Sequence, residues 1–282
     1  VDSSANYCKS HPLSGGKQIV CESWRNLVSV GAKPIAITNC LNFGNPENPE
    51  IMGQFAENVL GIKEACEFLD YPVVSGNVSF YNGTNNNNIY PTPVIGGVGL
   101  IKNLNKIQNH KFKKIDSQIM IIGKTFGHLD QSAFVNELLN IHDGMPPEIN
   151  LLNEKNNGEM ILKLIDNESI ASVHDISSGG IILALAEMSI SSQIGIKIQK
   201  PQKISNIFEY FFGEDQGRYL IEVDKNNLPK VEKKLKDNNI YFENIGITQK
   251  EYFELNKELK IKVKELYELN NRWYNKFNGL NS

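Results

Sequence analysis

Segments typical of strands and of helices alternate along the whole 282-residue chain, and this alternation limits the fold to the α/β or α+β class. The short, apolar and β-branched segment 33–41 predicts a buried strand. Apolar residues spaced three and four apart predict a helix over 50–69 and another over 16–30. Residues 72–81 and 93–101 predict two further strands.

A polar, lysine-rich segment at residues 102–117 indicates the boundary between two halves, and the length of 282 residues also favours two domains. We therefore expect one α/β domain over residues 1–105 and a second over residues 116–278. Within the second domain the pattern predicts, in order, a strand at 118–123, helices at 131–140 and 157–167, a strand at 170–173, a helix at 181–191, strands at 194–198 and 218–223, a helix at 226–237, strands at 240–247 and 251–262, and a closing helix from 263.

Charge and hydropathy exclude two broad classes of protein. The 29 Lys and Arg residues against 32 Asp and Glu residues give a formal net charge of −3, whereas a dedicated nucleic-acid binder normally carries a basic surplus. No apolar run reaches the length of roughly 18 residues that a membrane span needs. The chain has no apolar signal segment, so we expect it to be cytoplasmic. Because it begins at Val1 and not at Met, we also expect the reading frame to continue upstream.

Common motifs of nucleotide and metal chemistry do not occur in the sequence. It contains no GxxxxGK[ST] phosphate loop, no GxGxxG at a strand-to-helix turn, no HExxH and no GxSxG. The glycines of segment 95–99 lie within a predicted strand, where they favour close backbone packing over phosphate binding. The cysteines form no CxxC pair and are expected to be reduced core thiols: Cys8, Cys21, Cys40 and Cys66.

A polar segment, Ser-Gly-Asn-Val-Ser at 75–79, interrupts an otherwise apolar strand. One interpretation is a β-bulge or strand end whose side chains cap nearby backbone groups. The other is a ligand platform, in which Gly76 lets an anion or nucleotide approach the backbone, Asn77 offers an oxygen to a hard cation, and Ser79 donates a hydroxyl to phosphate. Asn39 ends the preceding strand, either as a turn former or as part of a ligand site.

Two later segments also place polar and charged residues at strand ends. In HDISSGG (174–180) a helix begins, and Asp175, Ser177 and Ser178 are expected to cap it, although the helix N-terminus and the adjacent histidine could instead bind phosphate. In FGEDQGR (212–218) two carboxylates lie beside a strand, and either a ligand site or an exposed turn explains them.

Three segments together, in this order and spacing, are similar to the synthetase subunit of phosphoribosylformylglycinamidine synthase: AITNCLNFGNPE (36–47), PVVSGNVSFYN (72–82) and PTPVIGGVGL (91–100). More narrowly, they resemble the second half of that subunit in the small, multi-subunit form of the enzyme. HDISSGG and FGEDQGR are similar to the family's last domain and recur more loosely across the AIR synthase-like (PurM-like) superfamily. The resemblance covers nearly the whole chain.

The resemblance implies a fold and a reaction. The unit would have an N-terminal α/β domain, whose sheet pairs with its twin to form a barrel, followed by a C-terminal α/β domain. The reaction would be the ATP-dependent conversion of formylglycinamide ribonucleotide to formylglycinamidine ribonucleotide in de novo purine synthesis. ATP would activate the amide oxygen as a phosphate ester, which glutamine-derived ammonia displaces, with Mg²⁺ as the metal cofactor.

The resemblance also implies roles for individual residues. Asn39 and Gly76 would contact ATP, Asn77 would bind Mg²⁺, and Ser79 would contact the substrate. The family usually has Asp at the position of Asn39. Counterparts of the family's catalytic histidines and acidic magnesium ligands do not occur here, so we expect no catalytic residue in this chain, which would be an incomplete enzyme. A pseudosymmetric, non-catalytic pocket would be lined by His174, Asp175 and Glu214.

The implied partners are the first half of the same subunit, a glutaminase subunit and a small bridging subunit, without nucleic acid or membrane. Two other interpretations stay open. One is a stand-alone, homodimeric AIR synthase-like enzyme that uses ATP, which would need a second set of active-site residues. The other is a non-catalytic scaffold half that holds a structural nucleotide.

Overall fold

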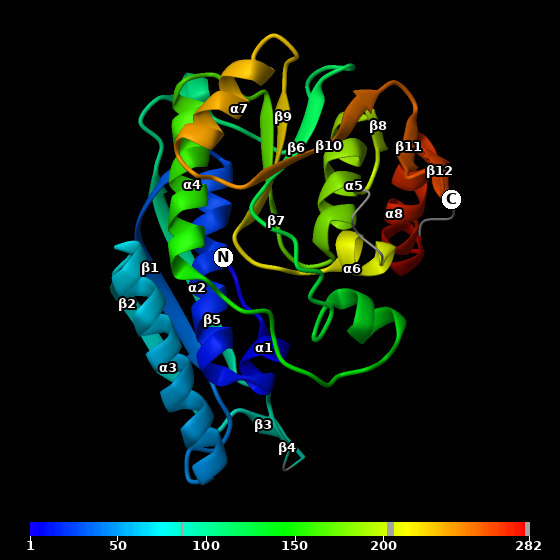
Figure 1. Ribbon diagram of the computed structural model, residues 1–282. Coiled ribbons are helices and arrows are strands. Elements are labelled where there is room, and N and C mark those ends of the chain that lie inside the picture. Colours follow the sequence, from blue (N-terminus) through cyan, green and yellow to red (C-terminus); the bar gives the residue numbers. More distant parts are fainter. Residues whose placement is uncertain (86, 202–205, 280–282) are drawn as a thin grey trace.

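Figure 1 shows the computed structural model of the chain, which describes residues 1–85, 87–201 and 206–279. The N-terminal part, coloured blue to cyan, lies beside the C-terminal part, coloured green to red, and each part is built around its own sheet. The mixed α/β class that the alternation of segments predicts is confirmed.

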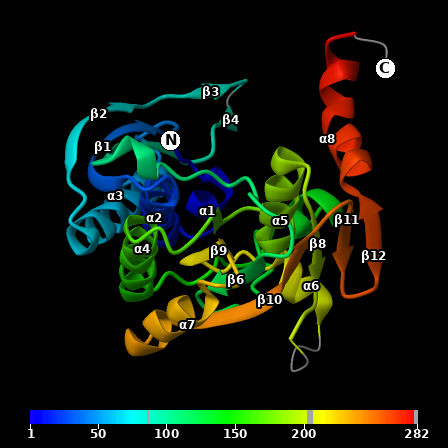
Figure 2. The ribbon, with the colours of Figure 1, turned by 90° about the horizontal axis from the view of Figure 1, so that it is seen from above.

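The N-terminal part has three helices packed on a small sheet. Its elements are α1 (Ala5–Ser10), α2 (Pro12–Ser29), β1 (Lys33–Asn42), α3 (Pro49–Leu69), β2 (Val73–Ser79), the short β3 (Gly83–Thr84) and β4 (Asn87–Asn88), and β5 (Thr92–Leu100). The sheet order is β2–β1–β5, with β1 parallel to β2 and antiparallel to β5. Figure 2 shows β2 on the outer side of this sheet. Among the described residues the sheet is open and forms no barrel.

The strand predicted at 33–41 is correct in position, but only one of its faces is buried. Ile37 and Leu41 are buried in the core that α2 and α3 share with the sheet. Thr38, on the opposite face, is exposed, and Cys40 is half-buried. The strand therefore covers the helices with one face and leaves the other face open.

The helix predicted at 50–69 is α3, and local chemistry sets its ends. The side chain of Asn48 accepts a hydrogen bond from the backbone N–H of Glu50 at 2.9 Å, and Pro49 occupies the first turn. Asp70 ends the helix in the left-handed conformation, with φ at 53°. These signals direct the chain from β1 through α3 and back into the parallel strand β2.

The C-terminal part follows the 3₁₀ turn η1 (Leu104–Lys106). Its elements are β6 (Gln118–Ile122), the π-helical turn η2 (Phe134–Leu138), α4 (Leu151–Asp166), β7 (Ser172–Ile176), α5 (Gly180–Ser192), β8 (Gly195–Ile198), α6 (Ile207–Phe212), β9 (Arg218–Val223), α7 (Leu228–Asp237), β10 (Phe242–Gln249), β11 (Tyr252–Leu255), β12 (Leu259–Lys262) and α8 (Val263–Phe277). The sheet has the order β12–β11–β8–β10–β6–β9–β7.

Both faces of this sheet are buried at its centre. On β6, Met120 and Ile122 belong to the core beneath α4 and α7, while Ile119 and Ile121 face the core beneath α5. The first of these cores also contains Trp24 of α2 and residues of the N-terminal sheet. Because one hydrophobic core runs through both parts, burial fixes how they sit against each other.

Differences from the predicted elements have local causes. The helix predicted at 131–140 is reduced to η2, and the strand predicted at 251–262 is a hairpin that turns at the left-handed residues Asn256 and Lys257. The helix predicted from 157 begins already at Leu151, because Asn150 caps it. The pattern does not predict α1 and α6, since six residues carry little periodic signal.

The expectation that the cysteines are free core thiols agrees with the structure at three of the four positions. All four cysteines are free, and Cys8, Cys21 and Cys66 are buried core thiols, whereas Cys40 is half-buried. No helix in the described part of the chain is long and apolar enough to cross a membrane.

Candidate functional site

The parallel pair β1–β2 brings the two predicted ATP contacts together. In the register of this pair, Asn39 lies beside Gly76, and Asn42 lies beside Ser79. A Cβ atom built on Gly76 would lie only 1.9 Å from Oδ1 of Asn39, so glycine leaves the space that the asparagine amide occupies. The polar segment continues the strand to Ser79, and the irregularity in the ladder falls earlier, beside Ile37.

A groove of about 400 Å³ runs along the helix-facing side of this strand pair. It lies between β1, α3 and the beginning of β2, and its walls include Leu41, Val59 and Ile62. Asn39 contributes an amide to this otherwise largely apolar lining. A concave, mostly apolar groove with few polar groups is the usual form of a small-molecule site.

Asn77 and Ser79 lie on the other face of the same strands. Paired residues of parallel strands point to the same side of a sheet, and Asn77 pairs with Cys40, whereas Gly76 pairs with Asn39. The four predicted site residues therefore form two pairs on opposite faces. Because β2 is the outermost strand, a single ligand can reach both faces only around its free edge.

The hydroxyl of Ser79 is held in place by Asn82. The Asn82 amide nitrogen donates to the backbone oxygens of Ser79 and Phe43, at 3.0 Å each, and lies 3.1 Å from Oγ of Ser79. These bonds join the end of β2 to the loop that follows β1. The sequence reasoning did not assign Asn82, although its place three residues after Ser79 suits a side chain that closes a local turn.

Asn77 suits a magnesium ion as one oxygen ligand. Its side chain is exposed and makes no hydrogen bond within the described ranges. Mg²⁺ commonly keeps several waters and substrate phosphates and takes few ligands from the protein. No group of three His, Cys, Asp or Glu side chains in the described residues is arranged to hold a metal. Further ligands would thus come from phosphate, water or another polypeptide.

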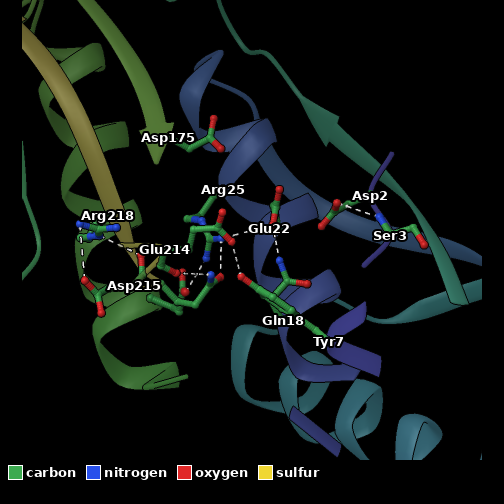
Figure 3. A network of polar contacts seen from close by, with 12 residues as sticks. Asp2, Ser3, Tyr7, Gln18, Glu22, Arg25, Asp175, Glu214, Asp215 and Arg218 are labelled. Carbon is green, nitrogen blue, oxygen red and sulfur yellow. Dashed lines mark hydrogen bonds and ion pairs between the residues drawn. The ribbon is translucent and has the colours of Figure 1, made fainter. Parts of the chain in front are cut away.

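The carboxylates of segment 212–218 are buried, so the interpretation as an exposed turn is wrong. Glu214 accepts hydrogen bonds from the backbone N–H groups of Gly179 and Ala133, at 2.7 Å each. The hydroxyl of Tyr7 donates to its other oxygen at 2.5 Å (Figure 3). Glu214 therefore joins three segments that are distant in sequence.

Glu214 also explains how α5 begins. The prediction that Asp175, Ser177 and Ser178 cap this helix is wrong. The N-cap residue is Gly179 in the left-handed conformation, and it has no side chain that could accept a hydrogen bond from the first turn. The Glu214 carboxylate accepts the Gly179 N–H and so occupies the positive end of the helix. A phosphate bound there would meet this carboxylate, which disfavours the phosphate interpretation.

His174 lies between two carboxylates. Its Nδ1 is 3.3 Å from Oδ1 of Asp175, and its Nε2 is 2.8 Å from Oε2 of Glu187. Burial acts to lower the pKa of His174, but the hydrogen bonds and charges of both carboxylates outweigh it and raise the pKa to about 9. The charged imidazole thus holds β7 to α5.

A second, polar cavity of about 290 Å³ lies where α1 and α2 face the segments around Glu214 (Figure 3). Its lining consists of Asp2, Ser3, Ser4, Ala5, Asn6, Tyr7, Gln18, Glu22, Gln131, Ala133, Asn136, Glu137, Ser178, Glu214 and Gln216. Of the residues expected in a pseudosymmetric pocket, Glu214 lines this cavity. Sequence reasoning missed Gln18 and Glu22, whose spacing of four places them on one helix face but gives no sign that this polar face is buried.

Acidic groups are crowded in this polar cavity. Burial, reinforced by the nearby negative charges, raises the pKa of Glu22 to about 8. Burial also raises the pKa of Asp2 to about 6. Buried side-chain oxygens of Asp2, Gln18 and Asn136 have no hydrogen-bond partner in the described chain. The carboxyl group of Glu22 therefore holds its proton more tightly than that of an exposed glutamate.

Replacing Glu22 with Gln is expected to stabilise the chain at alkaline pH and to have little effect at pH 5. The folded-state pKa of about 8 exceeds the ordinary pKa of 4.5. The free energy of unfolding therefore falls progressively as the pH rises from about 4.5 to about 8, because the folded chain resists the ionisation of Glu22. The amide cannot ionise, and at pH 9 the variant should be more stable by at least about 2 kcal/mol. Urea unfolding at pH 5 and pH 9 measures this, with the exposed Glu57→Gln as control. An equal effect at both pH values would contradict the assignment.

Comparison with known proteins finds the same family along both parts of the chain. Residues 1–101 match the AIR synthase related protein, N-terminal domain, and residues 119–255 match the AIR synthase related protein, C-terminal domain. The chain is 55% identical over 273 residues to the phosphoribosylformylglycinamidine synthase subunit PurL of Pelagibacter ubique (strain HTCC1062), over 97% of this chain and 37% of that protein. For PurL of Rhodopseudomonas palustris (strain BisB5) the identity is 42%, over 99% of this chain and 38% of that protein. The chain thus spans a little over a third of these relatives' length.

Solved structures share the fold at low sequence identity. T. maritima PurL complexed with FGAR superposes with a TM-score of 0.76 and 16% identity, over 94% of this chain and 45% of that chain. T. maritima PurL complexed with ATP superposes with a TM-score of 0.69 and 15% identity, over 91% of this chain and 41% of that chain. The HypE–HypF complex contains a similar fold, with a TM-score of 0.64 and 18% identity over 88% of this chain and 83% of that chain. The fold by itself therefore does not specify one activity.

Proposed function

Because the chain belongs to the AIR synthase related family, we propose that it is the second half of the synthetase subunit of phosphoribosylformylglycinamidine synthase. Its two domains would extend over residues 1–105 and 116–278. The whole enzyme would convert formylglycinamide ribonucleotide to formylglycinamidine ribonucleotide with ATP and glutamine-derived ammonia. The observation that carries the proposal is that all four predicted ligand contacts lie on the strand pair β1–β2, Asn39 and Gly76 on one face and Asn77 and Ser79 on the other.

Each of these contacts has a role that its chemistry supports. Asn39 and Gly76 would contact ATP, with the missing side chain of Gly76 leaving the space in which the Asn39 amide lies. Asn77 would give an oxygen ligand to Mg²⁺, which when bound neutralises phosphate charge. Ser79, whose hydroxyl donates to Oδ1 of Asn82 at 3.3 Å in this structure, would contact the substrate in place of that bond. An ATP molecule that contacts both Asn39 and the magnesium ion would pass around the free edge of β2.

The partners of the chain would be the first half of the same subunit, a glutaminase subunit and a small bridging subunit, in the cytoplasm. The open face of the N-terminal sheet supports the first of these partners, because Val98 and Leu100 are about half exposed on it. A structure of PurLQS from Thermotoga maritima is among the structures with this fold, with a TM-score of 0.70.

Turnover should require a second polypeptide. We expect this chain, mixed with one that spans the remaining part of a PurL relative, to form ADP, inorganic phosphate and formylglycinamidine ribonucleotide from ATP, formylglycinamide ribonucleotide and ammonia. The chain alone should show no turnover, because it contains none of the expected catalytic residues. Turnover by the chain alone would instead favour a stand-alone homodimeric enzyme.

Replacing Asn77 with Ala is expected to weaken binding of magnesium–ATP by about tenfold or more, because one metal ligand is lost. Binding of ATP in the presence of EDTA should not change. Isothermal titration of both proteins, with and without Mg²⁺, measures the difference. The control is Asn105→Ala, which removes an exposed amide in η1, outside the strand pair β1–β2. If Asn77→Ala binds magnesium–ATP like the unchanged chain, a scaffold half is favoured over a synthetase half.

A further inference from the structure

The amide of Asn39 is a polar group without a partner in the groove described above. Its side chain is half-buried, lines the groove, and makes no hydrogen bond in the part of the chain that the structure describes. A Cβ atom at Gly76 would collide with its Oδ1, so the amide lies directly over the glycine. A half-buried amide with free donor and acceptor positions suits a ligand that offers a hydrogen-bonding edge.

The charges at the rim indicate which part of a nucleotide fits here. Lys63 and Glu67 form an exposed ion pair at 3.8 Å, and Asp70 adds a second carboxylate. This rim has a net negative charge, so it disfavours a polyphosphate. The walls at Leu41 and Ile62 are apolar, and they suit the flat surface of an uncharged ring. The groove therefore fits the base of a nucleotide and not its phosphates.

The chemistry of an amide determines which bases it can recognise. An asparagine side chain has both an N–H₂ donor and a carbonyl acceptor, and rotation about its last torsion exchanges them. It can accept from the amino group at position 6 of adenine or donate to the oxygen at position 6 of hypoxanthine. A carboxylate accepts only, so it attracts a 6-amino group and repels a 6-oxo group.

We propose that Asn39 makes the base subsite of this chain tolerant of both 6-amino and 6-oxo purine nucleotides. The inference rests on the proposed function, because it takes the groove as part of the nucleotide site. Asn39 is then a specificity-determining residue, and the chain binds inosine triphosphate nearly as well as ATP. Gly76 supports this role, since a side chain at that position would occupy the space of the Asn39 amide.

The test compares ATP with inosine triphosphate, which differs from it in the base alone, by titration calorimetry in the presence of Mg²⁺. The unchanged chain should bind the two nucleotides with dissociation constants within about fivefold of each other. The Asn39→Asp variant should bind inosine triphosphate at least about tenfold more weakly than ATP. Val59→Phe, which fills the groove, should weaken the binding of both nucleotides. Leu60→Phe, which changes a similarly exposed neighbour outside the groove, should weaken the binding of neither.

The possible outcomes separate this inference from the proposed function. If the chain binds ATP but binds inosine triphosphate more than about thirtyfold more weakly, the proposed tolerance is overturned and the proposed function stays intact. An unchanged ratio in Asn39→Asp would show that residue 39 does not select the base, which also overturns the inference. Binding unaffected by Val59→Phe would place the base outside the groove. Absence of binding of either nucleotide would overturn both proposals.

Discussion

Replacing Arg25 with Met is expected to lower the free energy of unfolding by about 3–5 kcal/mol. The guanidinium of Arg25 is fully buried on α2, and it donates to Oε1 of Glu154 on α4 at 2.5 Å and to Oε1 of Gln216 at 2.7 Å. Burial raises the pKa of Glu154, and Arg25 acts against this increase. Without Arg25, the Glu154 carboxylate stays buried with no cation beside it. Because this pair joins the two parts of the chain, both should unfold earlier in urea.

The double variant Arg25→Met, Glu154→Met tests the cause of this loss. Two apolar side chains of similar size then replace the buried ion pair, and most of the lost stability should return. The exposed pair of Lys63 and Glu67 is the matched control, since Lys63→Met should change the free energy of unfolding by less than about 0.5 kcal/mol. A double variant as unstable as Arg25→Met alone would show that the uncompensated charge is not the cause.

Replacing Gly158 with Ala is expected to destabilise the chain by about 2–3 kcal/mol. A Cβ atom at this position of α4 would lie 2.0 Å from Cζ3 and 2.4 Å from Cη2 of Trp24, a rigid and buried ring on α2. It would also lie 3.0 Å from the hydroxyl of Tyr219. Neither ring can withdraw without disturbing the core that both parts share. Urea unfolding monitored by tryptophan fluorescence measures the effect.

Gly53→Ala is the control for this substitution, because it makes the same chemical change in another helix. Gly53 lies in α3, and a Cβ atom there meets nothing within 4 Å. Alanine restricts the unfolded chain and favours the helix, so this variant should be more stable by about 0.5–1 kcal/mol. The two substitutions should therefore have opposite signs. A stabilising Gly158→Ala would contradict the close packing of α2 on α4.

The elements with strong periodic signals were predictable from the sequence. The apolar spacing over residues 50–69 is a local signal, so α3 could be placed within one residue. The six-residue helices α1 and α6 carry no such signal, and they form because the rest of the fold packs around them. Which face of β1 is buried depends on the helices that cover it, and apolar composition alone does not show this.

The polar residues of both strands were predictable, but the expectation that Asn39 ends its strand is wrong, because β1 continues to Asn42 and Gly76 lies in the middle of β2. The face on which each residue lies was not predictable. One irregularity in the ladder beside Ile37 sets the register of the pair, and a shift of one residue exchanges the faces. Glu214 shows a second limit. Its partners Tyr7, Ala133 and Gly179 lie 207, 81 and 35 residues away in the chain, so no local pattern could indicate that it is buried.

Because β2 is the outermost strand, its free edge can either pair with a further strand or be crossed by one ligand that contacts both Asn39 and Asn77, but not both at once. Its outer edge carries backbone N–H and C=O groups that no strand of the described sheet pairs with, so another strand can add there. Such an addition would separate the side of the sheet that carries Asn39 from the side that carries Asn77. If the sheet grows at this edge, the two asparagines serve different ligands. If one ligand bridges them, the edge is closed to any further strand.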